Sequence, residues 1–213
     1  MPESRPDRST FVSIAALSGL ALCANVLLAQ IATPSPSQLT ATGQVEVDGR
    51  QVAYRVRHLP VSSFPDLPAP IAAELATRGC LIPQTYQARR PENVIHGSLE
   101  HSGSNDWAVL CSVNGQVSLL VFFSTATAAQ PIVLATQPET DRLQQHDPSH
   151  ELGFNWGIDA ASPQHVHDAL AGMDKRPAPL DHDALADSIL DIKTVYHLYR
   201  NGAWERVVVD QSL

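Results

Sequence analysis

Histidines and carboxylates gather in the C-terminal half of the chain, where together they could supply metal ligands. The set is His146, His150, His165, His167 and His182, with Glu151, Asp168, Asp181 and Asp183 nearby. Zinc binds imidazole nitrogens and carboxylate oxygens in a tetrahedral arrangement. Pro148 lies between His146 and His150 and would begin a helix rather than continue one. His165 and His167 are two positions apart on an expected helix and point to nearly opposite sides. We therefore expect no metal and no other cofactor.

Asp181, Asp183 and Asp187 have the acidic spacing from which a calcium loop could start. The central glycine and the distal glutamate of an EF-hand loop are missing. Carboxylates in the first turn of a helix are favoured by its free N–H groups and its dipole. The spacing therefore indicates a helix start more than a calcium site.

A Gly/Ser-rich segment contains the residue types of a serine hydrolase. Its members are Ser98, Ser102 and Ser104, with His96, His101 and Asp106 close in sequence. None of the serines lies in a G-x-S-x-G elbow, and Ser and Gly are common in turns. An extracytoplasmic hydrolase is therefore the alternative function, and a binding or structural role is favoured.

Cys80 and Cys111 are the two cysteines that follow an apolar N-terminal segment, which itself contains Cys23. Removal of that segment would leave a single possible pairing. The sequence predicts a Cys80–Cys111 disulfide and an oxidising environment outside the cytoplasm, with two buried free thiols as the alternative. The two cysteines do not form a C-x-x-C motif, which argues against a thioredoxin-like role.

Trp156 lies between Gly153 and Gly157 in a segment that we expect to be a loop. An aromatic side chain on a loop could contact a partner, whereas simple packing is the alternative. Trp156 is thus the candidate contact for an unknown extracytoplasmic partner. The net charge of −8 and the lack of a basic run exclude nucleic acid as the expected partner.

The first 32 residues have the order of a signal peptide, because Arg5 and Arg8 precede a long apolar run. Residues 11–32 are also long enough to remain as a membrane anchor, and Cys23 leaves lipid attachment open. Residues 33–43 are expected to form a flexible Pro/Ser-rich linker, followed by a single exported domain over 44–213, periplasmic or secreted. Membrane contact is expected only through the N-terminal segment.

The secondary structure expected around these residues consists of β-hairpins and short helices. Alternating or apolar runs flank Asp-Gly or Asn-Gly pairs, which predicts three hairpins, over residues 44–57, 106–123 and 192–209. Capping signals predict three short helices, over residues 71–78, from 163 to about 172 and from 181 to about 190. Residues 137–160 are polar and are expected to have no regular secondary structure. The expected fold is α+β, a mostly antiparallel sheet built from hairpins with about three short helices.

Four segments resemble a group of exported bacterial proteins without assigned activity, many from soil bacteria. They are Phe64–Pro68 (FPDLP), Gly79–Gln84 (GCLIPQ), Asn93–Gly97 (NVIHG) and Asp106–Ser112 (DWAVLCS). The likeness extends to residues 181–183 and to the closing hairpin. Residues 97–110 also look like the strand entry of calcium-binding propeller repeats, of whose loop aspartates only Asp106 is present. The main resemblance implies an uncharacterised exported domain and assigns it no activity.

Overall fold

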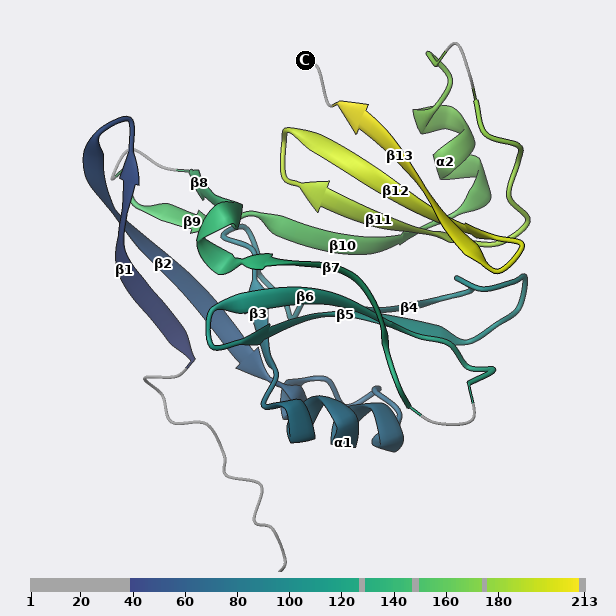
Figure 1. Ribbon diagram of the computed structural model, residues 1–213, viewed down its shortest axis with the longest axis horizontal. Coiled ribbons are helices and arrows are strands. Elements are labelled where there is room, and N and C mark those ends of the chain that lie inside the picture. Colours follow the sequence, from purple (N-terminus) through teal and green to yellow (C-terminus); the bar gives the residue numbers. More distant parts are fainter. Residues whose placement is uncertain (1–38, 127–128, 147–149, 174–175, 211–213) are drawn as a thin grey trace, which may run out of the picture. The chain divides into compact units, whose positions relative to one another are not determined.

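The computed structural model describes residues 39–126, 129–146, 150–173 and 176–210. These residues belong to one compact unit and contain thirteen strands and two α-helices (Figure 1). The predicted signal peptide or anchor over residues 1–32, and the start of the predicted linker, lie outside them. Among the described residues, no helix has the length and apolar character needed to cross a bilayer.

Nine strands form the larger sheet, whose main path runs β7-β6-β5-β3-β2-β9-β8. β1 pairs with β2 and β4 with β5 beside this path. The pairing of β2 with β9 is parallel, and the other pairings in this sheet are antiparallel. The strands are β1 (Thr40–Val47), β2 (Arg50–Pro60), β3 (Leu81–Gln84), β4 (Val94–Gly97), β5 (Asp106–Val113), β6 (Gln116–Phe122), β7 (Ile132–Pro138), β8 (Leu143–Gln145) and β9 (Leu152–Phe154).

A second, four-stranded antiparallel sheet follows in chain order. It consists of β10 (Trp156–Ala161), β11 (Ala184–Ile189), β12 (Lys193–Arg200) and β13 (Ala203–Asp210). Trp156, Ile158 and Leu185 of this sheet share one buried core with Leu110 and Leu119 of the larger sheet. The two sheets are therefore held together by apolar burial.

All three predicted hairpins are confirmed, because their turn residues adopt the backbone conformation that the sequence allows. The φ angles are 50° and 76° at Asp48-Gly49, 51° and 75° at Asn114-Gly115, and 50° and 80° at Asn201-Gly202. Positive φ at both central residues is the geometry of a type I′ turn.

The predicted helix over residues 71–78 is confirmed as α1 (Ala69–Arg78), which ends at Gly79 with a φ of 73°. Its buried residues Ile71 and Leu75 pack in a cluster with Val109 of β5. The helix predicted from Pro163 is α2 (Pro163–Ala169), whose cap Ser162 accepts the N–H of His165 at 3.2 Å. Val166 of α2 packs against the second sheet.

The predicted α+β class with about three helices is wrong, since the described chain is mostly β-structure with two α-helices. The segment expected to be a helix from residue 181 is strand β11. Its ladders with β10 and β12 outweigh the local capping signal, because tertiary pairing overrides a weak propensity. The segment 137–160, expected to be irregular, contains the 3₁₀ turn η2 (Glu139–Arg142) and strands β8, β9 and β10.

Candidate functional site

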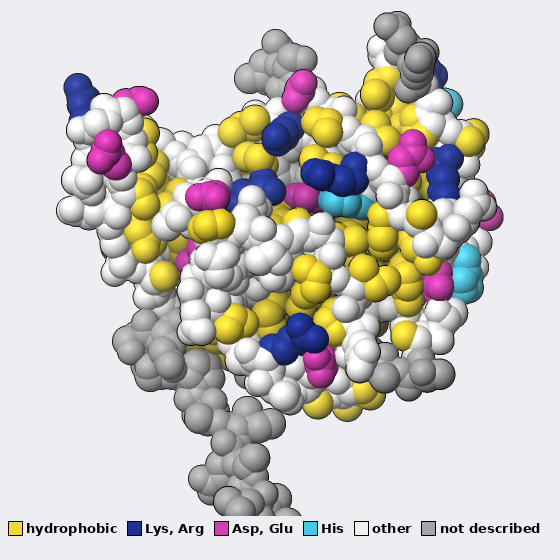
Figure 2. Space-filling view, viewed as in Figure 1, with side chains coloured by type: hydrophobic (Ala, Val, Ile, Leu, Met, Phe, Trp, Pro, Cys, Tyr) yellow, Lys and Arg dark blue, Asp and Glu magenta, His cyan; other side chains and the backbone are white. Residues whose placement is uncertain are grey.

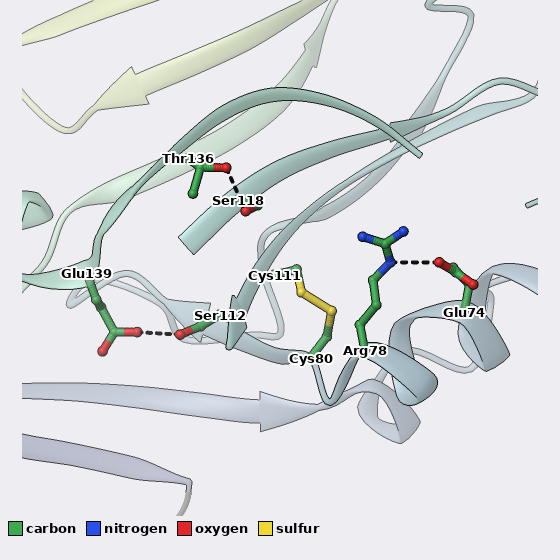
Figure 3. Close-up of a disulfide and its surroundings, with 8 residues drawn as sticks. All are labelled: Glu74, Arg78, Cys80, Cys111, Ser112, Ser118, Thr136 and Glu139. Atoms are coloured by element: carbon green, nitrogen blue, oxygen red, sulfur yellow. Dashed lines mark hydrogen bonds and ion pairs between the residues drawn. A yellow bond between two sulfur atoms is a disulfide. The ribbon is translucent and has the colours of Figure 1, made fainter. Parts of the chain in front are cut away.

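The Cys80–Cys111 disulfide is present, with the two Cα atoms 5.1 Å apart, as predicted (Figure 3). It joins the end of α1 to the middle of β5, and both cysteines are buried. Such a bond persists in an oxidising environment, which indicates a location outside the cytoplasm.

A cleft of about 710 Å³ opens beside this bridged region. Three short segments line it: residues 63–67, which begin at the last residue of the 3₁₀ turn η1 (Val61–Ser63), residues from Pro91 into β4, and Asn105 with the start of β5. The side chains that define its chemistry are Phe64, Asp66, His96, Asn105 and Trp107. This is the concave, mixed polar and apolar surface typical of a ligand site.

Two rings on neighbouring strands form one surface of the cleft. His96 of β4 is the cross-strand partner of Trp107 of β5. Their ring centroids are 5.2 Å apart, with planes tilted by 44°. Trp107 is half-buried and packs on the same cluster as Phe64, and its buried Nε1 has no hydrogen-bond partner among the residues that the structure describes. The indole therefore offers the cleft its ring rather than its N–H group.

The wall formed by residues 63–67 is fixed by its own backbone. The N–H of Phe64 donates to Val61 O at 3.1 Å, and the N–H of Leu67 donates to Phe64 O at 3.2 Å. Pro65 and Pro68 restrict φ on both sides of Asp66. Leu67 is buried, which anchors the turn to the core.

Asp106 stabilises the loop before β5, which forms the other wall of the cleft. Its side chain is fully buried and accepts the N–H groups of Leu99 at 2.9 Å, Glu100 at 2.8 Å and Ser124 at 2.8 Å. The Ser104 hydroxyl donates to the same carboxylate. This carboxylate therefore organises the loop before β5 and so places its neighbours Asn105 and Trp107.

The serines expected as hydrolase candidates engage other groups. Ser98 Oγ donates to the Ser104 carbonyl at 3.0 Å, and Ser104 Oγ bonds to the His101 carbonyl at 2.8 Å as well as to Asp106. In the described part of the chain, no hydroxyl of Ser98, Ser102 or Ser104 bonds to a histidine ring.

A second serine–histidine–carboxylate group, which the sequence did not reveal, lies in the core. Glu139 Oε2 accepts from Ser112 Oγ at 2.8 Å and lies 2.8 Å from His58 Nε2. Figure 3 places the Ser112–Glu139 contact close to the disulfide. Because the hydroxyl donates to the carboxylate and not to the imidazole, His58 is not placed to act as its base. All three side chains are about 5% exposed, so the group links β2, β5 and η2 inside the protein.

The histidines and acids considered as metal ligands are dispersed. Within the described ranges, no group of three or more His, Cys, Asp or Glu side chains is placed to hold a metal ion. The contacts made instead are His146–Tyr86, His150–Gln145, Glu151–Arg55, His165–Tyr196, Asp168–Gln164, Asp181–His182, His182–Tyr199 and Asp183–Ser98. His167 is an exposed residue of α2.

Trp156 does not lie on a loop as expected, and the alternative, simple packing, is what the structure shows in place of a possible partner contact. Trp156 opens strand β10, and its side chain is 0% exposed. The glycine that suggested a loop serves packing instead, because a Cβ on Gly153 would lie 2.6 Å from the Cβ of Tyr86. A partner therefore has no access to Trp156 in this structure.

Trp156 belongs to a buried charged cluster that joins the two sheets. Its Nε1 donates to Asp187 Oδ1 at 2.6 Å, and the Arg142 guanidinium lies 4.3 Å from its ring centroid. Asp187 Oδ2 lies 3.2 Å from His197 Nε2, and Arg142 Nη2 lies 3.9 Å from Asp187. Burial lowers the pKa of Arg142, an effect that the charge of Asp187 opposes. Figure 2 shows basic, acidic and histidine side chains side by side near the middle of the face that it displays.

Comparison with known proteins gives no relative. No family model, no curated protein and no solved structure matches this chain. The resemblance to exported bacterial proteins therefore stays a prediction, and the candidate site rests on its own geometry.

Proposed function

We propose that this protein is an exported binding domain whose ligand occupies the cleft around His96 and Trp107. The observation that carries this proposal is one cleft in which the turn around Asp66 meets the paired strands β4 and β5, and which contains an aromatic pair and polar side chains. Its volume of about 710 Å³ falls within the range of small-molecule sites.

The rigidity of the cleft supports a binding role. Prolines and turn hydrogen bonds fix the wall around Asp66, and the Asp106 carboxylate fixes the loop before Trp107. The disulfide ties β5 to the end of α1. A site formed in advance loses little conformational entropy on binding, so more of the contact energy appears as affinity.

Export rests on the oxidised cysteines and on the N-terminal sequence pattern. We propose that residues 1–32 act as a signal peptide, so that the domain is periplasmic or secreted. The alternative is that residues 11–32 anchor it to a membrane. Three of the segments that resemble exported bacterial proteins, Phe64–Pro68, Asn93–Gly97 and Asp106–Ser112, also contribute residues to the cleft.

The alternative function, an extracytoplasmic hydrolase, has less support. In the two serine-containing groups described above, Ser104 and Ser112 donate to carboxylates. A serine nucleophile needs its hydroxyl directed at a base, in reach of a bound substrate.

A fragment screen tests the proposed site. Saturation-transfer NMR on the purified domain identifies fragments that bind, and each hit is measured again with His96→Ala and with His167→Ala. Both histidines are exposed, but only His96 lines the cleft. We expect the hits to weaken at least about fivefold with His96→Ala and to be unchanged with His167→Ala. The proposal would be contradicted if the affinities of the hits were the same for wild type and both variants, or if the screen gave no hits.

A further inference from the structure

We propose that the ligand of this cleft carries a positively charged nitrogen, as an ammonium, quaternary ammonium or guanidinium group. This inference rests on the proposed function, since it assigns a chemical class to the ligand of the same site. It draws on the charge of the cleft, its aromatic surfaces and its hydrogen-bonding groups.

The charge of the cleft favours a cation. Among the described residues that line the cleft, Asp66 is exposed and is the one acidic residue, His96 is the other ionisable side chain, and no Lys or Arg is present. The whole chain carries a net charge of −8 at neutral pH. A carboxylate in a concave surface on an acidic protein attracts cations and repels anions.

The aromatic side chains favour the same class. Phe64 and Trp107 both line the cleft, and both pack on the apolar cluster beneath it. The face of an aromatic ring carries partial negative charge, and tryptophan binds cations more strongly than tyrosine or phenylalanine does. Quaternary ammonium groups are recognised by aromatic surfaces of this kind.

Two hydrogen-bond acceptors of the cleft suit the N–H groups of an ammonium or a guanidinium. Trp107 Nε1 is buried and so cannot donate to a ligand. Asp66 supplies a carboxylate, and Asn105 supplies an amide oxygen. A cleft of about 710 Å³ leaves room for a larger body attached to the charged group.

Paired ligands of equal shape isolate the charge. Choline is compared with its neutral isostere 3,3-dimethyl-1-butanol, and arginine amide with citrulline amide, at constant ionic strength. The dissociation constant is taken from the amide shifts of residues 94–97 and 105–107. We expect at least one cation to bind about fivefold or more tighter than its neutral partner.

Two substitutions assign that preference to the cleft. Asp66→Asn keeps the shape of an exposed side chain and removes its charge, so the preference for the cation should fall to less than about twofold. Glu46→Gln removes one charge from an exposed position on β1 and should leave the preference unchanged.

The outcomes separate this inference from the proposed function. Equal binding of a cation and its isostere would overturn the charge preference but would leave the proposed ligand cleft supported. Binding of a neutral oligosaccharide such as maltotriose, without binding of either cation, would do the same. No binding of the cations, while fragments still depend on His96, would also overturn this inference alone. Fragments that bind equally well to wild type and to His96→Ala would overturn both the proposed site and this inference.

Discussion

Asp106 is not among the residues that line the cleft, but it fixes the loop that does. The carboxylate collects three backbone N–H groups and one hydroxyl at the point where the loop enters β5. Asn105 and Trp107, on either side of it in the chain, both line the cleft. In the sequence, Asp106 stood out only as a carboxylate near the hydrolase candidates and as the one loop aspartate of a propeller-like segment, because a sequence does not show which donors a carboxylate will accept.

Substitution of Asp106 should therefore weaken both the fold and the site. Asp106→Asn replaces one acceptor oxygen by an N–H donor that faces backbone donors. We expect the free energy of unfolding to fall by about 2 kcal/mol, since buried hydrogen bonds to a charged group are the stronger kind. Urea denaturation measures this, with the exposed Asp159→Asn as control. A fall below about 0.5 kcal/mol would show that the loop does not depend on the carboxylate.

Tyr196 carries the clearest pH dependence. Burial raises the pKa of its hydroxyl above the ordinary value, and the oxygen lies 3.1 Å from His165 Nε2. Because the phenolate is disfavoured in the folded protein, its contribution to stability is present below the unfolded pKa of about 10 and is lost as pH rises through the folded pKa. Wild type should lose stability above about pH 10 relative to Tyr196→Phe. Urea denaturation at pH 9 to 11 checks this, and parallel curves would contradict it.

At the scale of elements, local signals identified the hairpins and missed the second sheet's first strands. The Asp-Gly and Asn-Gly turns set their own φ angles, so their positions were predictable. β10 and β11 instead depend on each other and on β12, which no local pattern encodes. The glycines around Trp156 indicated a loop. The packing reason for Gly153, the close approach of Tyr86, is not visible in the local sequence because Tyr86 is far away in the chain.

The disulfide acts at this scale, because it fixes α1 against the strand that carries Trp107. Val109 and Cys111 of β5 pack in the cluster that α1 covers, and Trp107 packs at its margin. The double variant Cys80→Ala/Cys111→Ala should lose about 3 kcal/mol of unfolding free energy. Chemical denaturation measures this, and wild type under reducing conditions provides the matched comparison. Equal stability of the oxidised protein and the double variant would show that the bridge adds nothing.

At the scale of the whole molecule, the two sheets meet through a shared core and the cluster around Asp187. Neither the sheet order nor this junction was predictable, because both depend on contacts between segments far apart in sequence. The cleft was not predictable either, because its lining residues Phe64, His96 and Trp107 are brought together only by the fold.

Removing the central carboxylate of that junction should be costly. Asp187→Ala removes from the largely buried Arg142 guanidinium the carboxylate with the largest charge effect on it, and it removes the acceptor of Trp156 Nε1. We expect a loss of about 3 kcal/mol, the cost of breaking a buried charge pair from one side. Asp159→Asn on β10 serves again as the exposed control. Thermal and urea unfolding measure the change, and a loss no greater than that of the control would contradict the assigned role.

Binding of the ligand beside Trp107 can be followed by NMR, because the chain has three tryptophans in different places. Each indole N–H gives its own signal in a ¹⁵N-correlated NMR spectrum, assigned by single substitutions. During titration with the tightest fragment from the screen, the Trp107 signal should shift in proportion to occupancy, since its ring lines the cleft. The signals of Trp156, buried in β10, and Trp204, in β13, should stay within the spectral linewidth. A shift confined to Trp156 or Trp204, with Trp107 unmoved at saturation, would contradict this account.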